Sequence, residues 1–254
     1  MADARTIKIP DANGNLVSYP IKDAINKRAR RDITSEVTSN PTKLTTAIAE
    51  QNLEKYGFIV GNEFHGASGY RYVLADPDTY YGGYNHNAVV NTHHYGIVVI
   101  TGITSAWGET TNGYDGSTLQ SVLENTVLNN IKSDLKAIFG GSTGLEHLIP
   151  HSKLFTTNAS TGLGWKTNKY ISALTEMQVF NGNVWSMNEY QNGEAVRGLE
   201  LFRKFRFNEI FGNVWVWLRN LFSDSTACFA YNDGHAIGNG VSYACDVVGL
   251  ILFY

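Results

Sequence analysis

Hydrophobic and polar residues alternate most clearly near the end of the chain, in the stretch GNVWVWLRN at residues 212–220. Trp215, Trp217 and Arg219 occupy every second position there, and aliphatic residues fill the positions between them. In an extended strand this spacing places two indoles and a guanidinium on one face and the aliphatic side chains on the other. The aliphatic face indicates a packed core. The aromatic face is either a second packed layer or a platform that holds a ligand.

The same kind of pattern predicts a β-rich ending for the chain. Residues 226–240 read as a hairpin that turns at Asp233-Gly234, a dipeptide typical of tight hairpin turns. Residues 246–254 are apolar on both faces, which indicates a strand in the middle of a sheet. Further strands are predicted upstream at 58–64, at 70–77 and, as one or two strands, within 88–103.

Apolar residues recur at helical spacing in three places beyond residue 100. The longest such stretch starts after Ser117, a suitable N-cap, and ends at Gly140. A shorter helix is predicted from about Ser172 to Phe180. Residues 195–211 are ambiguous, and we favour a helix there.

The start of the chain predicts an arm of different character. Two short strands, at 6–10 and 15–21, flank the turn signal Asn13-Gly14, and a short basic helix is expected over 22–33. Through residue 31 the chain has seven Lys or Arg against three Asp. We interpret this basic run as a solvated helix face rather than a nucleic-acid contact.

The arm is expected to extend to residue 55. It breaks at Asn40-Pro41 and resumes as a helix over 44–57, where a thin apolar stripe precedes Gly57. Because residues 1–55 cannot build a core alone, we expect them to dock onto a partner or onto copies of the same chain. Residues 56–254 are predicted to form one α+β domain.

Composition and charge limit the classes of function. The hydrophobic fraction is 43% and the formal net charge is -3, so the chain as a whole has no electrostatic reason to bind nucleic acid. No leader is visible in MADARTIKIP, and the longest apolar stretch, at 247–254, is far shorter than the roughly 20 residues that span a bilayer. We therefore expect synthesis in a cytoplasm without membrane insertion. Cys228 and Cys245 are expected to be buried free thiols, although a single bridge between them is the alternative.

Candidate catalytic and metal-binding residues do not form a recognised motif. Four histidines lie in the first half of the chain, at His65, His86, His93 and His94. His93 and His94 are adjacent, so on a strand they point to opposite faces and cannot both reach one metal ion. Asp76 and Asp78 suit a turn better than acid–base chemistry or calcium. The Gly-rich segments lack the Lys of a phosphate-binding loop, and we expect no catalytic residue, metal or cofactor.

Aromatic residues among Ser, Asn, Asp and Gly are the more informative signal. Tyr with small polar residues is the composition of recognition loops, because Tyr gives a large contact area at low entropic cost. These aromatic residues could equally pack the loops of the domain itself. The sequence pattern leaves both interpretations open.

The order of elements in the tail resembles a known family. A helix over ISALTEMQVF carries Glu176, and it is followed by the strand WLRN, the Asp233-Gly234 hairpin and the final strand DVVGLILFY. This order is similar to the C-type-lectin-like domains at the C-termini of many bacteriophage and gut-bacterial surface proteins. It also resembles the receptor-binding variable proteins of diversity-generating retroelements. The likeness covers roughly residues 170–254, and more loosely 58–254.

The sequence departs from the family pattern at several points. Asn220 stands where Ser is usual, and the final strand lacks the usual Arg and Pro. The calcium-dependent sugar-binding signatures of animal C-type lectins are absent, so the resemblance does not imply calcium-dependent sugar capture.

The resemblance implies a binding surface on the loops of the tail. Within W-L-R, Trp217 and Arg219 are expected to be scaffold, while Trp215 could be exposed as an anchor. The candidate contact residues are Trp215, Phe222, Asp224, Tyr231, Asn232, His235, Asn239 and Tyr243. Their expected roles are stacking and hydrogen bonding to a glycan or protein receptor.

The N-terminal arm also resembles the attachment segments of phage tail or head fibres. The candidate attachment residues are Ile7, Ile9, Val17, Tyr19 and Ile21. A homotrimer is expected from the habits of fibre proteins. The leading hypothesis is a non-enzymatic virion protein for host-cell recognition. The alternatives are a purely structural head-fibre, decoration or baseplate component and, less favoured, a cell-wall hydrolase.

Overall fold

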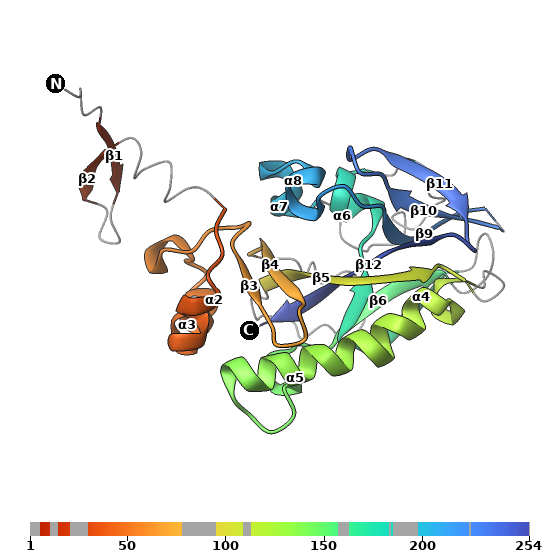
Figure 1. Cartoon of the computed structure of the whole chain (residues 1–254), viewed down its shortest axis with the longest axis horizontal. Helices are drawn as coiled ribbons and strands as arrows, with labels where there is room; N and C mark the ends of the chain where they lie inside the picture. The colour runs from red at the N-terminus through yellow and green to blue at the C-terminus, as the bar shows by residue number, and fades with distance from the viewer. Residues whose placement is uncertain are drawn as a thin grey trace.

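The computed structural model combines an eight-stranded sheet with short helices and one long helix (Figure 1). This arrangement agrees with the predicted α+β class. The structure describes residues 6–10, 15–20, 30–77, 95–108, 113–156, 163–182, 184, 198–223 and 225–253.

The large sheet has the strand order β11-β10-β9-β12-β5-β4-β3, and β8 pairs with β12 beside this path. These strands are β3 (Glu63–His65), β4 (Arg71–Asp76), β5 (Tyr95–Ala106), β8 (Ile171–Ala173), β9 (Val216–Ser223), β10 (Thr226–Ala230), β11 (Ala236–Gly240) and β12 (Ala244–Phe253). The predicted strand at 70–77 and the predicted hairpin at 226–240 are confirmed. The strand expected over 213–220 is present but begins at Val216 and runs to Ser223. The strand expected over 58–64 is shorter and later, because it begins at Glu63.

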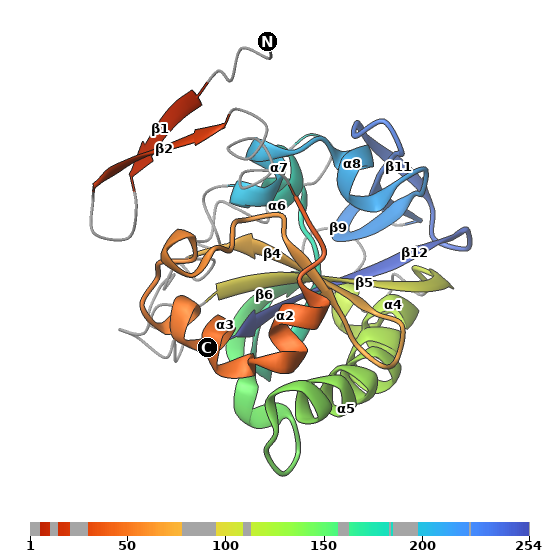
Figure 2. The same ribbon diagram turned by 60° about the vertical axis from the view of Figure 1, so that its left-hand side comes forward.

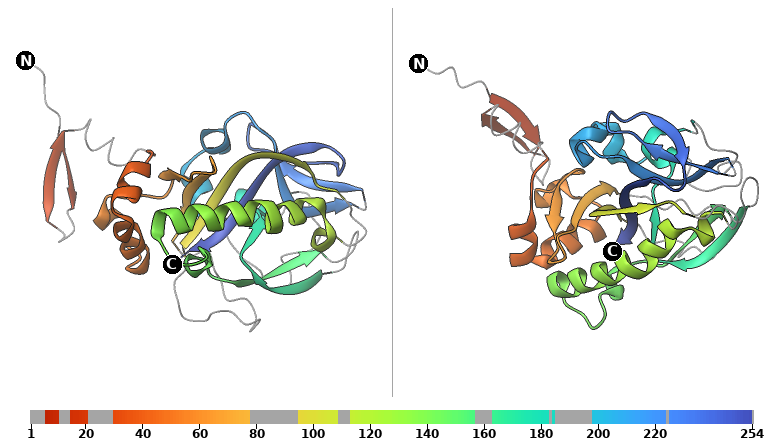
Figure 3. Two further views of the ribbon diagram at one scale, coloured as in Figure 1. Left: turned by 60° about the horizontal axis from the view of Figure 1, so that its bottom comes forward. Right: turned by 45° about the vertical axis from the view of Figure 1, so that its right-hand side comes forward.

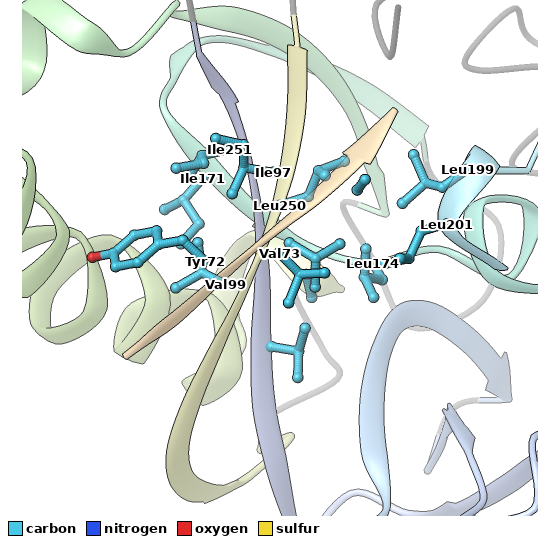
Figure 4. Close-up of a cluster of buried hydrophobic side chains, with 14 of the residues drawn as sticks. Tyr72, Val73, Ile97, Val99, Ile171, Leu174, Leu199, Leu201, Leu250 and Ile251 are labelled. Atoms are coloured by element: carbon cyan, nitrogen blue, oxygen red, sulfur yellow. The ribbon is translucent and has the colours of Figure 1, made fainter. Parts of the chain in front are cut away.

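The last strand is central, as its sequence predicts. β12 pairs antiparallel with β5 along one side, and on its other side it meets first β9, in parallel, and then β8. Its residues from Val247 to Phe253 are buried on both faces. Figure 4 shows Leu250 and Ile251 packed among Val73, Val99 and Ile171 from the neighbouring strands.

A long helical segment lies along one face of the sheet (Figure 3). It consists of α4 (Thr118–Ser121), a π-helical segment (Val122–Val127, η3) and α5 (Leu128–Phe139). The predicted start and stop are confirmed: the Ser117 side chain accepts a hydrogen bond from the Gln120 N–H, and Gly140 follows the last turn with φ 81°. The π-helical segment is not visible in the sequence pattern.

A buried carboxylate fixes this long helix to the β3–β4 hairpin. Asp134 of α5 accepts hydrogen bonds from the Tyr72 hydroxyl at 2.7 Å and from the Ser68 backbone N–H at 2.9 Å. Burial, with Asp134 beside it, raises the pKa of Tyr72 well above its usual range. The hydrogen bond from Tyr72 to Asp134 therefore positions the helix on the hairpin.

Three short helices lie on the other side of the sheet (Figure 2): α6 (Glu176–Phe180), α7 (Glu200–Lys204) and α8 (Phe207–Phe211). The helix predicted from Ser172 begins later, because residues 171–173 form β8 and Thr175 supplies a capping box with Gln178. The expected helix within 195–211 is present as α7 and α8.

The remaining elements are short. Three are 3-10 turns: η1 (Glu54–Tyr56), η2 (Tyr114–Gly116) and η4 (Leu145–His147). A second small sheet pairs β6 (His151–Thr156) with β7 (Leu163–Lys169).

The N-terminal hairpin has the predicted strands, β1 (Thr6–Pro10) and β2 (Leu16–Pro20), paired antiparallel. The turn signal Asn13-Gly14 and most of the expected basic helix lie outside the described residues. At its described end this helix is absent, because Asp32 forms a β-bridge with Glu63 instead.

The packing of residues 30–56 differs from the expected arm. They form α2 (Thr34–Ser39), α3 (Pro41–Ala49) and η1, separated at Asn40-Pro41 where the sequence predicts a break. Val37, Leu44 and Ile48 are buried in the same core as β4 and β5. These helices dock onto their own chain, so residue 55 does not mark a break in packing.

Candidate functional site

Three of the candidate contact residues form one row of rings at the end of the β9–β10–β11 sheet. The centroid of Trp215 lies 4.9 Å from that of Tyr231, and Tyr231 lies 5.0 Å from His235. These spacings match the roughly 4.8 Å between neighbouring strands, because the three residues extend the three strands at the same level. The sheet register therefore brings together residues that are up to 20 positions apart. Below, these three residues are called the aromatic row.

A second row, buried beneath the first, supports it. The register pairs Phe229 with Trp217 on one side and with Ile237 on the other. Trp217 is fully buried, and its indole N–H donates to the carbonyl oxygen of Ser105 at 2.9 Å. Trp215 is 37% exposed, so the aromatic surface runs from the core out to solvent.

The turn at 231–235 is held by its own hydrogen bonds. The Gly234 N–H donates to the Tyr231 carbonyl at 2.8 Å, and the Tyr231 N–H donates to the His235 carbonyl at 2.9 Å. Gly234 has φ +89°, a conformation that favours glycine. The turn thus presents the rings of the aromatic row from a fixed backbone rather than from an open loop.

Polar groups flank the aromatic row at the tip of this turn. Asp233 accepts from the His235 backbone N–H at 3.2 Å and also pairs with the His235 ring. The backbone hydrogen bond is the main reason that the pKa of Asp233 is lowered, so this carboxylate stays ionised at neutral pH. The Asn232 side chain donates to that of Asn213.

Phe222 and Tyr243 lie elsewhere, contrary to the expectation of one continuous patch. A Cβ built on Gly238 would lie 3.1 Å from the Phe222 ring, and one on Gly240 would lie 3.6 Å from the Tyr243 ring. Gly238 and Gly240 alternate along β11 with Ile237, so these two rings cover the face opposite to the aromatic row. Aromatic rings that cover strand glycines are a known stabilising arrangement.

The other two candidates do not join the aromatic row. Asn239 uses its side-chain oxygen to accept from the Gly240 N–H at 2.8 Å, which caps a backbone group on the edge strand. Asp224 lies outside the described residues. The structure therefore groups Trp215, Tyr231 and His235, with Asn232 beside them in the turn.

The expected scaffold role of Trp217 and Arg219 agrees with their burial, since neither side chain is exposed. Next to them, Asn220 accepts a hydrogen bond from the Glu176 backbone N–H at 2.8 Å. Glu176 itself is buried and accepts from the Val184 N–H at 3.1 Å. Both faces of β9 are therefore core from Val216 to Leu221, and the exposed rings lie at its two ends, Trp215 before the strand and Phe222 near its last residue.

Cys228 and Cys245 are buried free thiols, as expected. Burial raises the pKa of Cys245 to about 12. Neither thiol is set up as a nucleophile, because reactive cysteines need a lowered pKa and access to solvent.

Four of the candidate attachment residues lie in the described strands of the N-terminal hairpin. The register pairs Ile7 with Tyr19 and Ile9 with Val17, at alternate positions along both strands. Ile21 lies outside the described residues.

The basic run that follows is only partly the solvated surface that the sequence suggests. Arg31 pairs with Glu36 at 2.9 Å and donates to the Gly57 carbonyl at 2.9 Å, while Arg30 lies 3.9 Å from Glu63. The last two arginines therefore fasten the chain to its own body. The sequence could indicate their charge but not these acceptors, which are distant along the chain.

The residues considered for metal binding and acid–base chemistry lie only partly within the described parts of the chain. Those parts hold no group of three or more His, Cys, Asp or Glu side chains placed to bind a metal ion. His86, His93, His94 and Asp78 lie outside them. Asp76 is buried and accepts a hydrogen bond from the Glu200 backbone N–H at 2.9 Å. Across the same residues, no helix is long and apolar enough to cross a bilayer.

Comparison of the chain with protein-family models, with curated proteins and with solved structures found no match. The assignment of a site therefore rests on the geometry of this chain. A partly exposed row of rings with an ionised carboxylate and amides beside it can pack against a ligand and hydrogen-bond to it.

Proposed function

We propose that this chain is a non-enzymatic bacteriophage virion protein that uses the aromatic row for recognition of the host-cell surface. In this proposal the N-terminal arm attaches the chain to other virion proteins, and the chain acts as a homotrimer on the particle surface. The receptor is a glycan or a protein. The observation that carries the proposal is the aromatic row itself.

The aromatic row has the features of a binding hot spot. Trp and Tyr are the residues most enriched at such positions, and here they sit beside polar groups that can hydrogen-bond a partner. Their backbone is fixed by the register of β9, β10 and β11 and by the turn hydrogen bonds. A surface ordered before binding loses less entropy when the partner arrives.

The proposal also specifies how the rings would be used. Tyr231 lies between Trp215 and His235 at about the strand spacing, so neighbouring rings face both sides of its ring. A receptor would meet the edge and hydroxyl of Tyr231. The outer faces of Trp215 and His235 would be the places for stacking.

The position of the arm supports separate ends for attachment and recognition. The part of the chain before Arg30, which is called the arm from here on, joins the body beside β3, where Asp32 bridges to Glu63. β3 is one edge of the large sheet. The aromatic row belongs to β9, β10 and β11, at the other edge (Figure 1). The proposal therefore gives attachment and recognition to different strands of the sheet.

The finer fold assignment is part of the proposal. The order α6, β9, β10–β11 hairpin and central β12 is the order found in the C-type-lectin-like domains that the sequence resembles. Buried Glu176 on α6 and its link to Asn220 on β9 would be the scaffold of such a domain.

A second candidate function has one observation in its favour. Phe222 and Tyr243 cover Gly238 and Gly240, which is a structural task, yet Tyr243 remains 57% exposed. A structural head-fibre, decoration or baseplate component would use such rings to contact neighbouring virion proteins.

Binding of the purified full-length chain to a panel of intact bacteria separates these functions. The label is placed on the N-terminus, and bound chain is counted by flow cytometry. The recognition function predicts saturable binding to at least one strain of the panel, which unlabelled chain displaces. Absence of displaceable binding to every strain would favour the structural component.

The same incubation tests the less favoured hydrolase. Release of soluble wall fragments, measured after the bound chain is removed, is expected to equal that of a buffer control. Fragment release that rises with time and chain concentration would contradict a non-enzymatic function.

A further inference from the structure

Helix α8 lies between the root of the N-terminal arm and the turn that carries the aromatic row. It is only five residues long, Phe207–Phe211, and Phe207, Ile210 and Phe211 are buried. The rings of Phe207 and Phe211 are 4.5 Å apart, and Phe202 of α7 lies 6.1 Å from Phe207. This compact aromatic cluster packs α8 against α7.

Two arginines hold the carboxyl end of α8. The Arg30 guanidinium donates to the Glu209 carbonyl, and the Arg71 guanidinium donates to the next carbonyl, that of Ile210, at 3.3 Å. Glu63 joins the two arginines, at 2.7 Å from Arg71 and 3.9 Å from Arg30. Cationic side chains at the last carbonyls of a helix are favourable because those carbonyls have no partner within the helix and carry partial negative charge.

The amino end of α8 packs against the turn. A Cβ built on Gly234 would lie 3.0 Å from the Cβ of Phe207. A side chain at position 234 would therefore be crowded, because the turn lies directly against the helix. Gly234 in turn donates to the carbonyl of Tyr231, the middle residue of the aromatic row. A shift of α8 along its axis therefore presses directly on this turn.

We infer that α8 couples the root of the arm, at Arg30, to the 231–235 turn, so that the position of one constrains the position of the other. This inference goes beyond the proposed function and does not need it, because the contacts exist whether or not the turn binds a host receptor. In a virion adhesin such coupling would link receptor contact to the attachment point on the particle.

Neighbouring arginines provide a matched test. Arg30 contacts α8, whereas Arg31 contacts Glu36 and the Gly57 carbonyl. The experiment compares full-length wild type, Arg30→Ala and Arg31→Ala by hydrogen–deuterium exchange at each peptide. Arg30→Ala is expected to raise exchange about fivefold both at 207–212 and at 231–235, the effect of losing one hydrogen bond of about 1 kcal/mol. Arg31→Ala is expected to leave both regions unchanged.

The opposite direction gives an independent check, because coupling between two sites is reciprocal. Gly234→Ala places a methyl group 3.0 Å from the Cβ of Phe207, so it perturbs the contact from the side of the turn, and it is expected to raise exchange at 207–212 and at 30–34. Unchanged exchange at 231–235 in Arg30→Ala, or an equal rise there in Arg31→Ala, overturns the inference. A rise confined to 207–212 overturns it as well, since α8 would then move without the turn. Thermal unfolding of each variant shows that the effect is local.

Discussion

Asn220 of β9 is a buried polar residue whose side chain is matched with a backbone group. Its side-chain oxygen accepts the backbone N–H of Glu176, the first residue of α6, while the asparagine itself is fully buried. The first N–H groups of a helix have no partner within the helix, so this side chain satisfies a group that would otherwise be buried and unpaired.

Asn220→Ala is therefore expected to lower the free energy of unfolding by about 2 kcal/mol, the cost of leaving a buried donor unsatisfied. Urea denaturation followed by tryptophan fluorescence measures this change. Asn239→Ala is the matched control, because Asn239 is partly exposed and accepts only from the adjacent Gly240. Equal losses in the two variants would contradict the role given to Asn220.

The two cysteines give a second prediction at this scale. Cys245 has a pKa of about 12, raised first by burial and then by Asp246, so almost none of it is thiolate at neutral pH. The pKa of the Cys245 thiol is higher in the folded chain than in the unfolded chain. The protonated thiol therefore contributes to stability at neutral pH, and this contribution is lost as the pH rises through the folded pKa. A thiol reagent at pH 7.5 is expected to label neither Cys228 nor Cys245 in the native chain and both after denaturation. Rapid native labelling would contradict their burial.

Single residues also show which structural features could be predicted from the sequence. The alternation in GNVWVWLRN predicts a strand, and burial of Trp217 and exposure of Trp215 agree with the scaffold and anchor expected of them. The sequence could not show that Phe222 and Tyr243 lie on the face opposite to Tyr231. That separation depends on the register of β10 and β11, which is set by pairing across the sheet.

At the scale of elements, α2 and α3 belong to the body because their apolar stripe is covered by the core. Leu44, Ala47 and Ile48 give only a thin stripe, which the sequence interpretation assigned to an external partner. A stripe of this kind indicates that a helix is covered, but not by which chain. The structure identifies α5 and the β-sheet of the same chain as the cover.

This packing predicts the result of truncation. A chain of residues 56–254 removes Val37, Leu44 and Ile48 from the core, and each such loss costs about 2–5 kcal/mol against a total stability of about 5–15 kcal/mol. It is expected to be insoluble or to unfold without cooperativity. A chain of residues 30–254 is expected to melt within a few degrees of full length. A cooperative melt of residues 56–254 at the full-length temperature would contradict the packing.

The junction between arm and body is predicted to loosen in acid. Partial burial tends to raise the pKa of Asp32 and Glu36, but hydrogen bonds from Thr34 to Asp32, and from Lys43 and Arg31 to Glu36, outweigh it and lower both values. A carboxylate with a lowered folded pKa stabilises the fold above its unfolded pKa of about 4, and this stabilisation is lost as pH falls through the folded value.

Exchange at residues 30–36, corrected for the intrinsic effect of pH, is therefore expected to be faster at pH 3 than at pH 7. Residues 247–253 of β12 supply the internal control, since none of these residues has an ionisable side chain. Equal corrected exchange at 30–36 at both pH values would show that these carboxylates do not hold the junction.

At the scale of the whole molecule, the junction with the arm and the aromatic row belong to strands at the two edges of one sheet, and α8 contacts both. The α+β class and the central position of β12 could be predicted, because hydrophobic period and two-sided apolarity are local properties of sequence. The docking of the arm's root and the grouping of the aromatic row could not be predicted from the sequence, because both depend on contacts between segments that are distant along the chain. Arg30 with Glu209 and Trp215 with Tyr231 are examples.

Binding of paired variants to host cells tests the central claim most directly. Trp215→Ala with His235→Ala removes the two outer rings of the aromatic row, while Phe222→Ala with Tyr243→Ala removes two rings of similar size from the opposite face. On a strain that binds the full-length wild type, the first pair is expected to weaken binding by about 30-fold or more, the loss of at least 2 kcal/mol that a hot spot carries. The second pair is expected to change binding less than threefold. Thermal unfolding of each variant is the control, and it must show that the variant is folded at the temperature of the binding measurement. Unchanged binding in the first pair, or an equal loss in the second, would contradict the aromatic row as the recognition surface.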